Sequence, residues 1–343
     1  MPCYVGLDAS KRLTSVCVLR SNGETVREGD IPTSPKAIVG FLRGDRLRYA
    51  RVGIEAGSVG SWLGPALIRA GLPVTQIETR RAHSILKERA NKTDRSDARG
   101  IADLMRTATF TPVHMKSSES QHVRALVTAR KLVKAKVLDL QNGIRGLLHG
   151  FGLPFDAGRA RSFEARARDA ARRLAIAQDV VLPLLTALAQ LHSILASYDK
   201  TIRAVAGASP VCSLLMTAPG VGPITALLFY SSIDDPLRFR RSRNVGPHFG
   251  LVPRTQQSGE SERRGRISKR GDAEARSSLY CAGLTALRTS TRPSWLKTWG
   301  LEVAARRGRK RAAVAVARRL AVILHRMWIT GTPFRWEQSG APA

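Results

Sequence analysis

The sequence has few acidic residues, few aromatic residues and only four cysteines. Lysine and arginine number 56 against 26 aspartates and glutamates, which gives a formal net charge of +30, and aromatic residues make up 6% of the chain. Cys3, Cys17, Cys212 and Cys281 are far apart, and the histidines are equally dispersed. None of them has the spacing of zinc ligands. We therefore expect reduced cysteines, as in a cytosolic protein, and no metal site built on cysteine or histidine.

Long hydrophobic runs are also missing. No transmembrane run is visible, and the first eight residues lack the basic segment and apolar stretch of a secretory signal. The apolar content of 43% over 343 residues is ordinary for a folded protein and allows two or three structural units. These features indicate a folded cytoplasmic protein without a membrane partner and exclude a disordered basic tail.

Positive charge is the dominant feature that is present. Charge alone fits DNA, RNA or an anionic membrane surface. Basic clusters are dense in the C-terminal half, at residues 237–241, 263–266 and 306–311. Because each neutralised phosphate releases counterions, this distribution favours strong, salt-dependent binding to duplex nucleic acid.

Residues 1–112 are expected to form a mixed α/β unit. Strands are predicted at about 4–7, 13–19, 24–27, 50–54 and 73–77, and helices at about 34–42, at 61–70 and from Thr93 onward. Antiparallel strands followed by alternating helix and strand are the order of a ribonuclease-H-type fold. Periodicity alone supports only a mixed α/β class.

Residues 113–207 show heptad spacing. Apolar residues recur at steps of three and four from Val123 to Leu147 and again from Val181 to Val205, with Arg130 interrupting the first run. The spacing predicts two helices in a coiled-coil hairpin or an intermolecular bundle, with self-association as its purpose. The alternative is that both helices pack into one globular core. Residues 208–343 form a third, mostly helical unit.

Four carboxylates are the candidates for chemistry. Asp8 and Glu55 end apolar strands, and Asp94 and Asp97 fall in the first turn of a helix that Thr93 would cap. Acidic residues in a first helical turn often only complement the helix dipole. Acids delivered by three separate elements, however, can build an oxygen-ligand site for Mg²⁺ or Mn²⁺. Two such ions would clamp the attacking and leaving oxygens of a phosphodiester.

Two further strings attract attention in the C-terminal unit. Gly220 and Gly222 form a tight turn between apolar helical segments, where free backbone N–H groups can bind a DNA phosphate; a simple αα-corner is the alternative. Ser258 lies in what reads as a flexible polar loop, where a serine is usually a turn residue. As a nucleophile it would need activation, which a metal ion could supply. The basic residues around it are expected to bind nucleic acid: Arg254, Arg263, Arg264, Arg266, Lys269 and Arg270.

Several strings taken together carry a family resemblance. Residues 6–11, 54–56, 91–98, 219–222 and 250–259 occur in the order found in the DEDD transposases of bacterial insertion sequences. These are the family numbered one hundred and ten, which includes the Piv-type DNA invertases. The chain resembles this family over nearly its whole length. One departure is that Gly57-Ser58 follows Glu55-Ala56 where the family often has Thr-Gly.

The resemblance implies a RuvC-like N-terminal domain whose metal-binding tetrad maps onto Asp8, Glu55, Asp94 and Asp97. It also implies a coiled-coil region and a C-terminal transposase domain with its nucleophilic serine at Ser258. Members of the family are recombinases guided by a structured bridge RNA that specifies donor and target DNA. They act as oligomers, here a dimer or tetramer, with a composite site that joins two subunits. On this basis the protein would associate with the nucleoid when bound to DNA.

Three other functions compete with a serine recombinase. A RuvC-like junction nuclease would use the acids to activate water and leave Ser258 without a role. A non-catalytic nucleic-acid-binding protein would use the charge and the helices alone. An ATPase of a related fold could begin a phosphate loop at Gly6-Leu7-Asp8, but the chain shows no later glycine-rich adenosine motif.

Overall fold

The computed structural model describes residues 2–44, 47–79, 93–153, 163–258, 261–289 and 291–337. The chain divides into two compact units, Met1–Lys116 and Ser117–Ala343. The division between the two units falls four residues after the predicted boundary at residue 112. The predicted boundary between residues 207 and 208 lies within the second unit.

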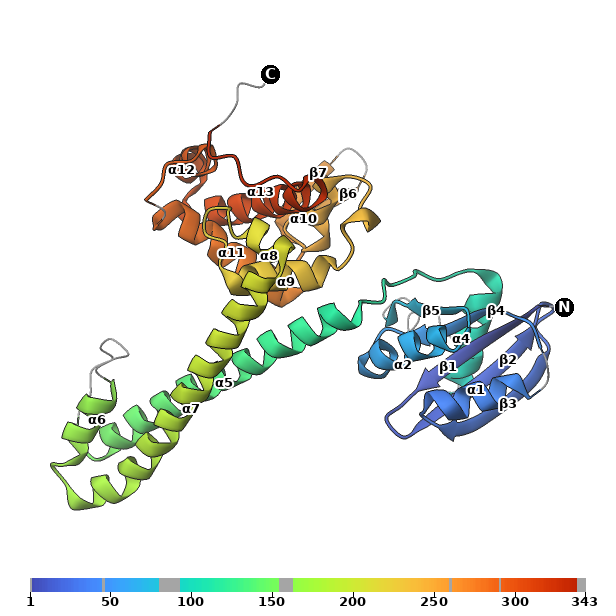
Figure 1. The fold of residues 1–343 in the computed structure, drawn as a ribbon, viewed down its shortest axis with the longest axis horizontal. Helices are drawn as coiled ribbons and strands as arrows, with labels where there is room; N and C mark the ends of the chain where they lie inside the picture. The colour runs from blue at the N-terminus through green and yellow to red at the C-terminus, as the bar shows by residue number, and fades with distance from the viewer. Residues whose placement is uncertain are drawn as a thin grey trace. The chain divides into compact units, whose positions relative to one another are not determined.

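The first unit is a five-stranded sheet with helices on both faces (Figure 1). Its described elements are β1 (Cys3–Ala9), β2 (Leu13–Arg20), β3 (Thr25–Pro32), α1 (Pro35–Arg43), β4 (Tyr49–Glu55), α2 (Ser58–Arg69), β5 (Val74–Ile77) and α4 (Asp94–Thr107). The strand order is β3-β2-β1-β4-β5; β1 to β3 pair antiparallel, whereas β4 pairs parallel with β1 and β5. The mixed α/β class and the order of elements are confirmed.

The two faces of this sheet carry different helices. Ile38 and Leu42 of α1 and Leu63 and Leu67 of α2 are buried in one core cluster with the side chains of β1, β2 and β4. The opposite face belongs to α4, whose Ile101 and other apolar residues are buried there. Because side chains alternate along a strand, the residues that face α4 are the even-numbered ones of β1.

Gly6 allows α4 to approach β1 closely. A Cβ atom at Gly6 would lie 2.0 Å from the carbonyl oxygen of Ala98 and 2.4 Å from the backbone nitrogen of Ala102. Any side chain at this position would therefore push the helix away from the sheet. The contact fixes α4 at the end of β1 that carries Asp8.

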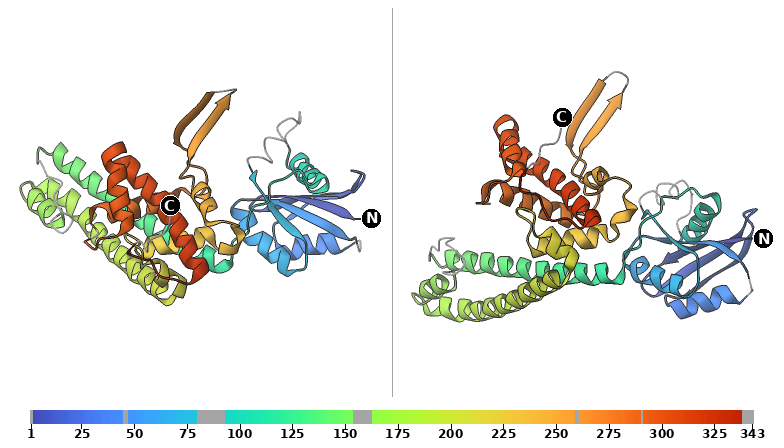
Figure 2. Two further views of the ribbon diagram at one scale, coloured as in Figure 1. Left: turned by 90° about the horizontal axis from the view of Figure 1, so that it is seen from above. Right: turned by 45° about the horizontal axis from the view of Figure 1, so that its top comes forward.

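The second unit begins with two long helices joined at one end by a short one. These are α5 (Ser118–Gly150), α6 (Phe163–Ala171) and α7 (Ala175–Ala208), and α5 and α7 lie side by side (Figure 2). Val137 and Ile144 of α5 are buried together with Val181 and Leu188 of α7, as the heptad spacing predicts. At several predicted positions the following residue is the more buried one: Val127, Leu148, Leu185 and Ala206 are buried, whereas Leu126, Leu184 and Val205 are half-buried and Leu147 is exposed.

The two helices take part in two cores. Far from the C-terminal helices they pack with α6, whereas Val123, Val127, Ile202 and Ala206 join the main core of the second unit. The alternative of packing into a globular core therefore holds for the ends of the two helices that carry these four residues, and the coiled coil stays a prediction. Of the described helices, α7 is long and apolar enough to cross a membrane by length and composition alone. Its buried side chains pack against α5 and α6.

The rest of the second unit is mostly helical, as expected. Its described elements are α8 (Pro210–Leu215), α9 (Pro223–Ile233), η2 (Pro236–Arg238), η3 (Ser242–Asn244), α10 (Val245–His248), β6 (Pro253–Ser258), β7 (Ser261–Ile267), α11 (Ala273–Arg288), α12 (Trp295–Arg307) and α13 (Arg309–Thr330). The predicted flexible loop around Ser258 was wrong in one respect. Residues 253–258 form a strand that pairs antiparallel with β7, and this hairpin projects from the helices (Figure 2).

Candidate functional site: an acidic sheet edge

Asp8 and Glu55 lie next to each other at the end of two parallel strands. Leu7 pairs with Ile54 in the register of β1 and β4, so Asp8 and Glu55 follow as neighbours. Gly53, like Gly6, faces α4, because a Cβ atom there would lie 2.7 Å from Met105. Since side chains two residues apart share a face, both carboxylates are on the face that α4 covers.

Asp94 and Asp97 extend the sheet-facing stripe of α4. The helix buries Ala98, Ile101 and Met105, and the two aspartates continue this stripe by one turn toward the helix N-terminus. Thr93 caps the helix as predicted: its hydroxyl accepts from the N–H of Ser96 at 3.1 Å, and the Ser96 hydroxyl accepts from the N–H of Thr93 at 2.9 Å. The cap defines where the helix begins and so where both aspartates lie.

A row of polar side chains that no sequence pattern predicts connects the start of α4 to the sheet. Ser15 pairs with Asp8 on one side and with Asp30 on the other. The Ser15 hydroxyl donates to Asp30 Oδ1 at 2.6 Å, and Arg95 Nη2 contacts Asp30 Oδ2 at 3.1 Å. These bonds, from Ser15 first and then from Arg95, lower the pKa of the Asp30 carboxyl. The strand predicted at 24–27 ended before Asp30, so the sequence offered no signal for this contact.

The four acids share one edge of the sheet but are not gathered into one cluster. Asp8 and Glu55 line a cavity of about 190 Å³ with Gly57, Ser58 and Thr79, and the two aspartates of α4 are outside its lining. In the part of the chain that the structure describes, no group of three or more His, Cys, Asp or Glu residues is arranged to hold a metal ion. The donor chemistry fits Mg²⁺ or Mn²⁺, because carboxylate oxygens are the ligands these ions prefer.

Ser258 ends β6, and its backbone pairs with Ser261 of β7. The side chains of Ser258, Arg263 and Arg264 lie outside the described part of the structure. Arg254, Arg266, Lys269 and Arg270 are exposed, and Arg254 Nη2 donates to the carbonyl oxygen of Ser268 at 3.3 Å.

The base of the β6–β7 hairpin is held by two glycines. Gly250 and Gly271 both have positive φ, and a Cβ atom on either would lie about 2 Å from a backbone oxygen of the other segment (2.2 and 2.0 Å). Arg276 Nη1 adds hydrogen bonds of 3.1 Å to the carbonyl oxygens of Phe249 and Arg270. The hairpin therefore leaves the helices from a tightly packed base.

The Gly220–Gly222 turn is packed rather than open. Gly220 has φ +77, and a Cβ atom there would lie 2.2 Å from the carbonyl oxygen of Ala282 in α11. Contact with a helix accounts for this glycine without a ligand, which favours the αα-corner over phosphate binding at this residue. Gly222, at the N-cap of α9, has no such neighbour within 4 Å.

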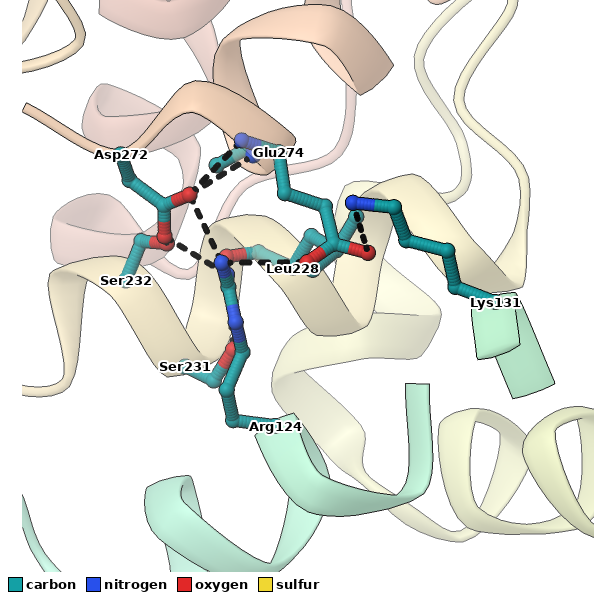
Figure 3. Close-up of polar contacts among 8 residues, drawn as sticks. Arg124, Lys131, Leu228, Ser231, Ser232, Asp272 and Glu274 are labelled. Carbon is teal, nitrogen blue, oxygen red and sulfur yellow. Dashed lines mark hydrogen bonds and ion pairs between the residues drawn. The ribbon is translucent and has the colours of Figure 1, made fainter. Parts of the chain in front are cut away.

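A second polar cluster that the sequence did not reveal joins three helices of the second unit (Figure 3). The Arg124 guanidinium of α5 donates two hydrogen bonds, of 2.6 and 2.8 Å, to the carboxylate of Asp272, the N-cap of α11. The Ser232 hydroxyl of α9 donates to the same carboxylate at 2.6 Å. Burial alone would raise the pKa of the Asp272 carboxyl. The bonds from Arg124, from Ser232 and from the N–H of Ala275 outweigh it and lower the pKa to about 2.

Comparison with known proteins identifies the class. A family model described as transposase of the IS116/IS110/IS902 family matches residues 212–299, and a DEDD transposase model of the IS110 type matches residues 5–152. The transposase for insertion sequence element IS1111A of Coxiella burnetii is 35% identical over 264 residues, which cover 74% of this chain and 71% of that protein. A probable family 20 transposase of Pseudomonas aeruginosa is 31% identical over 258 residues, which cover 72% of this chain and 75% of that protein.

These matches place the protein among the transposase enzymes. The chain belongs to the IS116/IS110/IS902 family of insertion-sequence transposases, as its sequence motifs predict. One family model covers the first unit together with α5, and the other covers residues 212–299.

Proposed function

We propose that this transposase cuts and rejoins donor and target DNA through a covalent serine–phosphate intermediate, with Mg²⁺ or Mn²⁺ held by Asp8, Glu55, Asp94 and Asp97. The observation that carries the proposal is that Asp8 and Glu55 end neighbouring strands on the face that α4 covers, and that Asp94 and Asp97 begin α4, in a chain of net charge +30. Carboxylates can hold divalent cations next to a phosphate, and the bound cations then offset the repulsion between carboxylate and phosphate.

The sheet supports a RuvC-like, ribonuclease-H-type assignment for the first unit. Three antiparallel strands lead into two parallel ones, and the acids sit at the ends of β1 and β4 and at the start of α4. In open α/β sheets, ligands bind beyond the carboxyl ends of parallel strands. Asp8 and Glu55 occupy that place.

The protein's own residues have separate roles in the proposed reaction. The Ser258 oxygen attacks the phosphorus of a DNA phosphodiester, a new serine–phosphate bond forms, and the bond to the leaving DNA oxygen breaks, so that a free DNA hydroxyl is released. Attack by a hydroxyl of another strand reverses the step and frees the serine. Bound metal ions would lower the pKa of the attacking hydroxyl and stabilise the leaving oxygen. The arginines at 254, 263, 264 and 266 offset the charge that grows on the phosphorane.

Trapping the protein–DNA adduct tests the serine. Denaturation during the reaction with a cleavable DNA end should leave a covalent adduct on the wild type and none on Ser258→Ala. The matched control is Ser261→Ala, which removes the same hydroxyl from the paired position of the hairpin and should still form the adduct. An adduct that survives Ser258→Ala would overturn the serine assignment. Strand cleavage without any adduct in the wild type would favour the junction nuclease.

Alanine at Asp94 or Asp97 tests the tetrad. Recombination should vanish while salt-dependent DNA binding persists, because removing a carboxylate from a basic protein does not weaken its attraction to phosphate. The control is Asp103→Ala on the same helix. The Asp103 carboxylate forms an ion pair of 3.2 Å with Arg106 and is not one of the four proposed metal ligands. Full recombination activity in both variants would overturn the tetrad assignment.

The proposed partners are donor and target DNA, a structured guide RNA and further copies of the chain as a dimer or tetramer. Self-association is supported by large apolar side chains that stay exposed on α5 and α7, among them Leu132, Leu138, Ile176 and Ile194. An interchain coiled coil would cover them, and a composite site would then bring Ser258 of one copy to the acids of another. The RNA follows from the family resemblance, and a single defined transcript should co-purify with the protein from its host. The proposed location is the cytoplasm, at the nucleoid when DNA is bound.

A further inference from the structure

A cavity of about 430 Å³ lies beside the end of α13, remote in sequence from the acids and from Ser258. Its apolar wall includes Trp295, Ile323, Met327 and Phe334, and its polar lining includes Arg326, Arg335 and Glu337. The volume falls within the range of roughly 300–1,000 Å³ that small-molecule sites occupy. The lining therefore combines an apolar wall with guanidinium groups at the surface.

Aromatic side chains lie in this cavity and next to it. Trp295 and Phe334 line the cavity and their rings stack, whereas Trp336 packs edge-on against Phe334 from outside the lining, and Trp299 shares the guanidinium of Arg319 with Trp295. Arginines lie over their rings: Arg292 over Trp336 at 4.2 Å, and Arg319 over Trp299 at 4.4 Å and over Trp295 at 5.1 Å. The cavity thus has one tryptophan and one phenylalanine in its wall, with further aromatic rings and arginines packed behind them.

The segment that closes the cavity is fixed in place by hydrogen bonds. Trp295 Nε1 donates to the carbonyl oxygen of Arg335 at 2.9 Å, and the Trp295 N–H donates to that of Trp336 at 3.2 Å. The Phe334 N–H donates to the Thr217 hydroxyl at 3.0 Å, and Phe334 itself is buried. The walls are thus held in position before any ligand arrives, which lowers the entropy cost of binding.

We propose that this cavity binds an unstacked base of a single-stranded nucleic-acid segment. Planar bases stack on aromatic side chains and pack against arginine, and this recognition tolerates any base sequence. Exposed Arg326 and Arg335 at the same cavity suit the flanking phosphates. The carboxylate of Glu337 accepts hydrogen bonds and so suits an amino group on a base rather than a phosphate.

The inference rests on the proposed nucleic-acid partner but not on the metal tetrad or on Ser258. A strand exposed during DNA exchange and an unpaired loop of a guide RNA present the same chemistry. The test therefore uses one DNA and one RNA strand of matched sequence, and the arm with the tighter base-dependent binding identifies the source.

The experiment measures binding of a short single strand with and without one abasic position at fixed salt. The wild type should bind the intact strand on the order of tenfold more tightly, in line with the stacking energy of about 1–3 kcal/mol per base. Thr332→Trp fills the cavity from its exposed rim without changing charge and should remove this preference. The matched control, Thr289→Trp, places the same side chain at an exposed position outside the lining and should keep it.

A charge-reversal pair separates the cavity from general attraction to phosphate. Arg326→Glu and Arg288→Glu remove equal charge from exposed positions, one in the lining and one outside it. Both should weaken binding to duplex DNA alike, and only Arg326→Glu should weaken single-strand binding further. Photo-cross-linking from a halogenated base should mark the peptides that contain Met327 or Trp295. The proposal is overturned if the wild type shows no preference for the intact strand, if Thr332→Trp retains the preference, or if the cross-links map elsewhere.

Discussion

Gly6 shows how one absent side chain positions the candidate site. Gly6→Ala would bring a Cβ atom within 2.0 Å of a backbone oxygen of α4, and neither backbone yields easily. We expect a loss of roughly 1–3 kcal/mol of unfolding free energy, the usual cost of overpacking, measured by urea denaturation. Gly40→Ala is the control, because its Cβ would meet nothing within 4 Å and a helical alanine is favoured. Equal stability of the two variants would contradict the close packing of α4 on β1.

Asp30 of β3 forms an ion pair of 3.1 Å with Arg95, which lies between Asp94 and Asp97 on α4. This pair connects the start of α4 to the sheet. Asp30→Asn should leave the unfolding free energy nearly unchanged, because an exposed ion pair contributes roughly 0–1 kcal/mol. It should raise the Mg²⁺ or Mn²⁺ concentration needed for half-maximal strand cleavage, since the start of α4 loses its anchor. Glu24→Gln, which breaks the exposed pair with Arg20 at 3.1 Å, is the control. An unchanged metal requirement for Asp30→Asn would show that Asp30 does not position the aspartates.

At the scale of elements, Asp272 connects α11 to α5 and α9. Its pKa of about 2 lies below the ordinary value of 3.8, so the folded state binds the proton less readily than the unfolded chain. The carboxylate therefore stabilises the fold above pH 3.8, and this contribution is lost as the pH falls through about 2.

Asp272→Asn should accordingly lower the free energy of unfolding by about 2 kcal/mol at neutral pH, from the shift in pKa, and Arg124 would keep only its ion pair with Glu274 at 3.3 Å. The difference in unfolding free energy between the variant and the wild type should shrink as the pH falls from 4 to about 2. Urea denaturation at a series of pH values measures it. Asp139→Asn is the matched control, because its pair with Lys136 is exposed and 3.9 Å long. A difference that stays constant with pH would show that the ionised carboxylate is not the stabilising group.

At the scale of the whole molecule, exposed apolar side chains on the long helices predict association between copies. Leu132, exposed by 64%, and Ile194, exposed by 46%, lie on α5 and α7. Changing each to lysine should lower the oligomeric state seen by sedimentation and leave the monomer folded, because neither side chain is in the core. Leu237→Lys, at a residue exposed by 78% outside the two helices, should leave the oligomer intact. Unchanged assembly in both helix variants would exclude this surface as the interface.

Much of the molecule is determined locally by the sequence. The alternation of strand and helix, the cap at Thr93 and the carboxylates at the ends of β1 and β4 follow from short-range propensity and spacing. The heptads likewise predict the buried faces of α5 and α7 in part, because at several positions, such as Leu148 and Leu185, the buried residue is the one after the predicted position. Charge and motif order were enough to identify the family.

The tertiary structure decided what comes together. The backbone contact at Gly6, the Asp30–Arg95 pair and the Arg124–Asp272 pair each join residues far apart in sequence, which no local pattern encodes. The pairing of β6 with β7 replaced an expected loop, because cross-strand hydrogen bonds can order a polar, arginine-rich segment that has no apolar alternation of its own. The cavity lined by Trp295 and Phe334 likewise forms because the segment after α13 folds back against the start of α12.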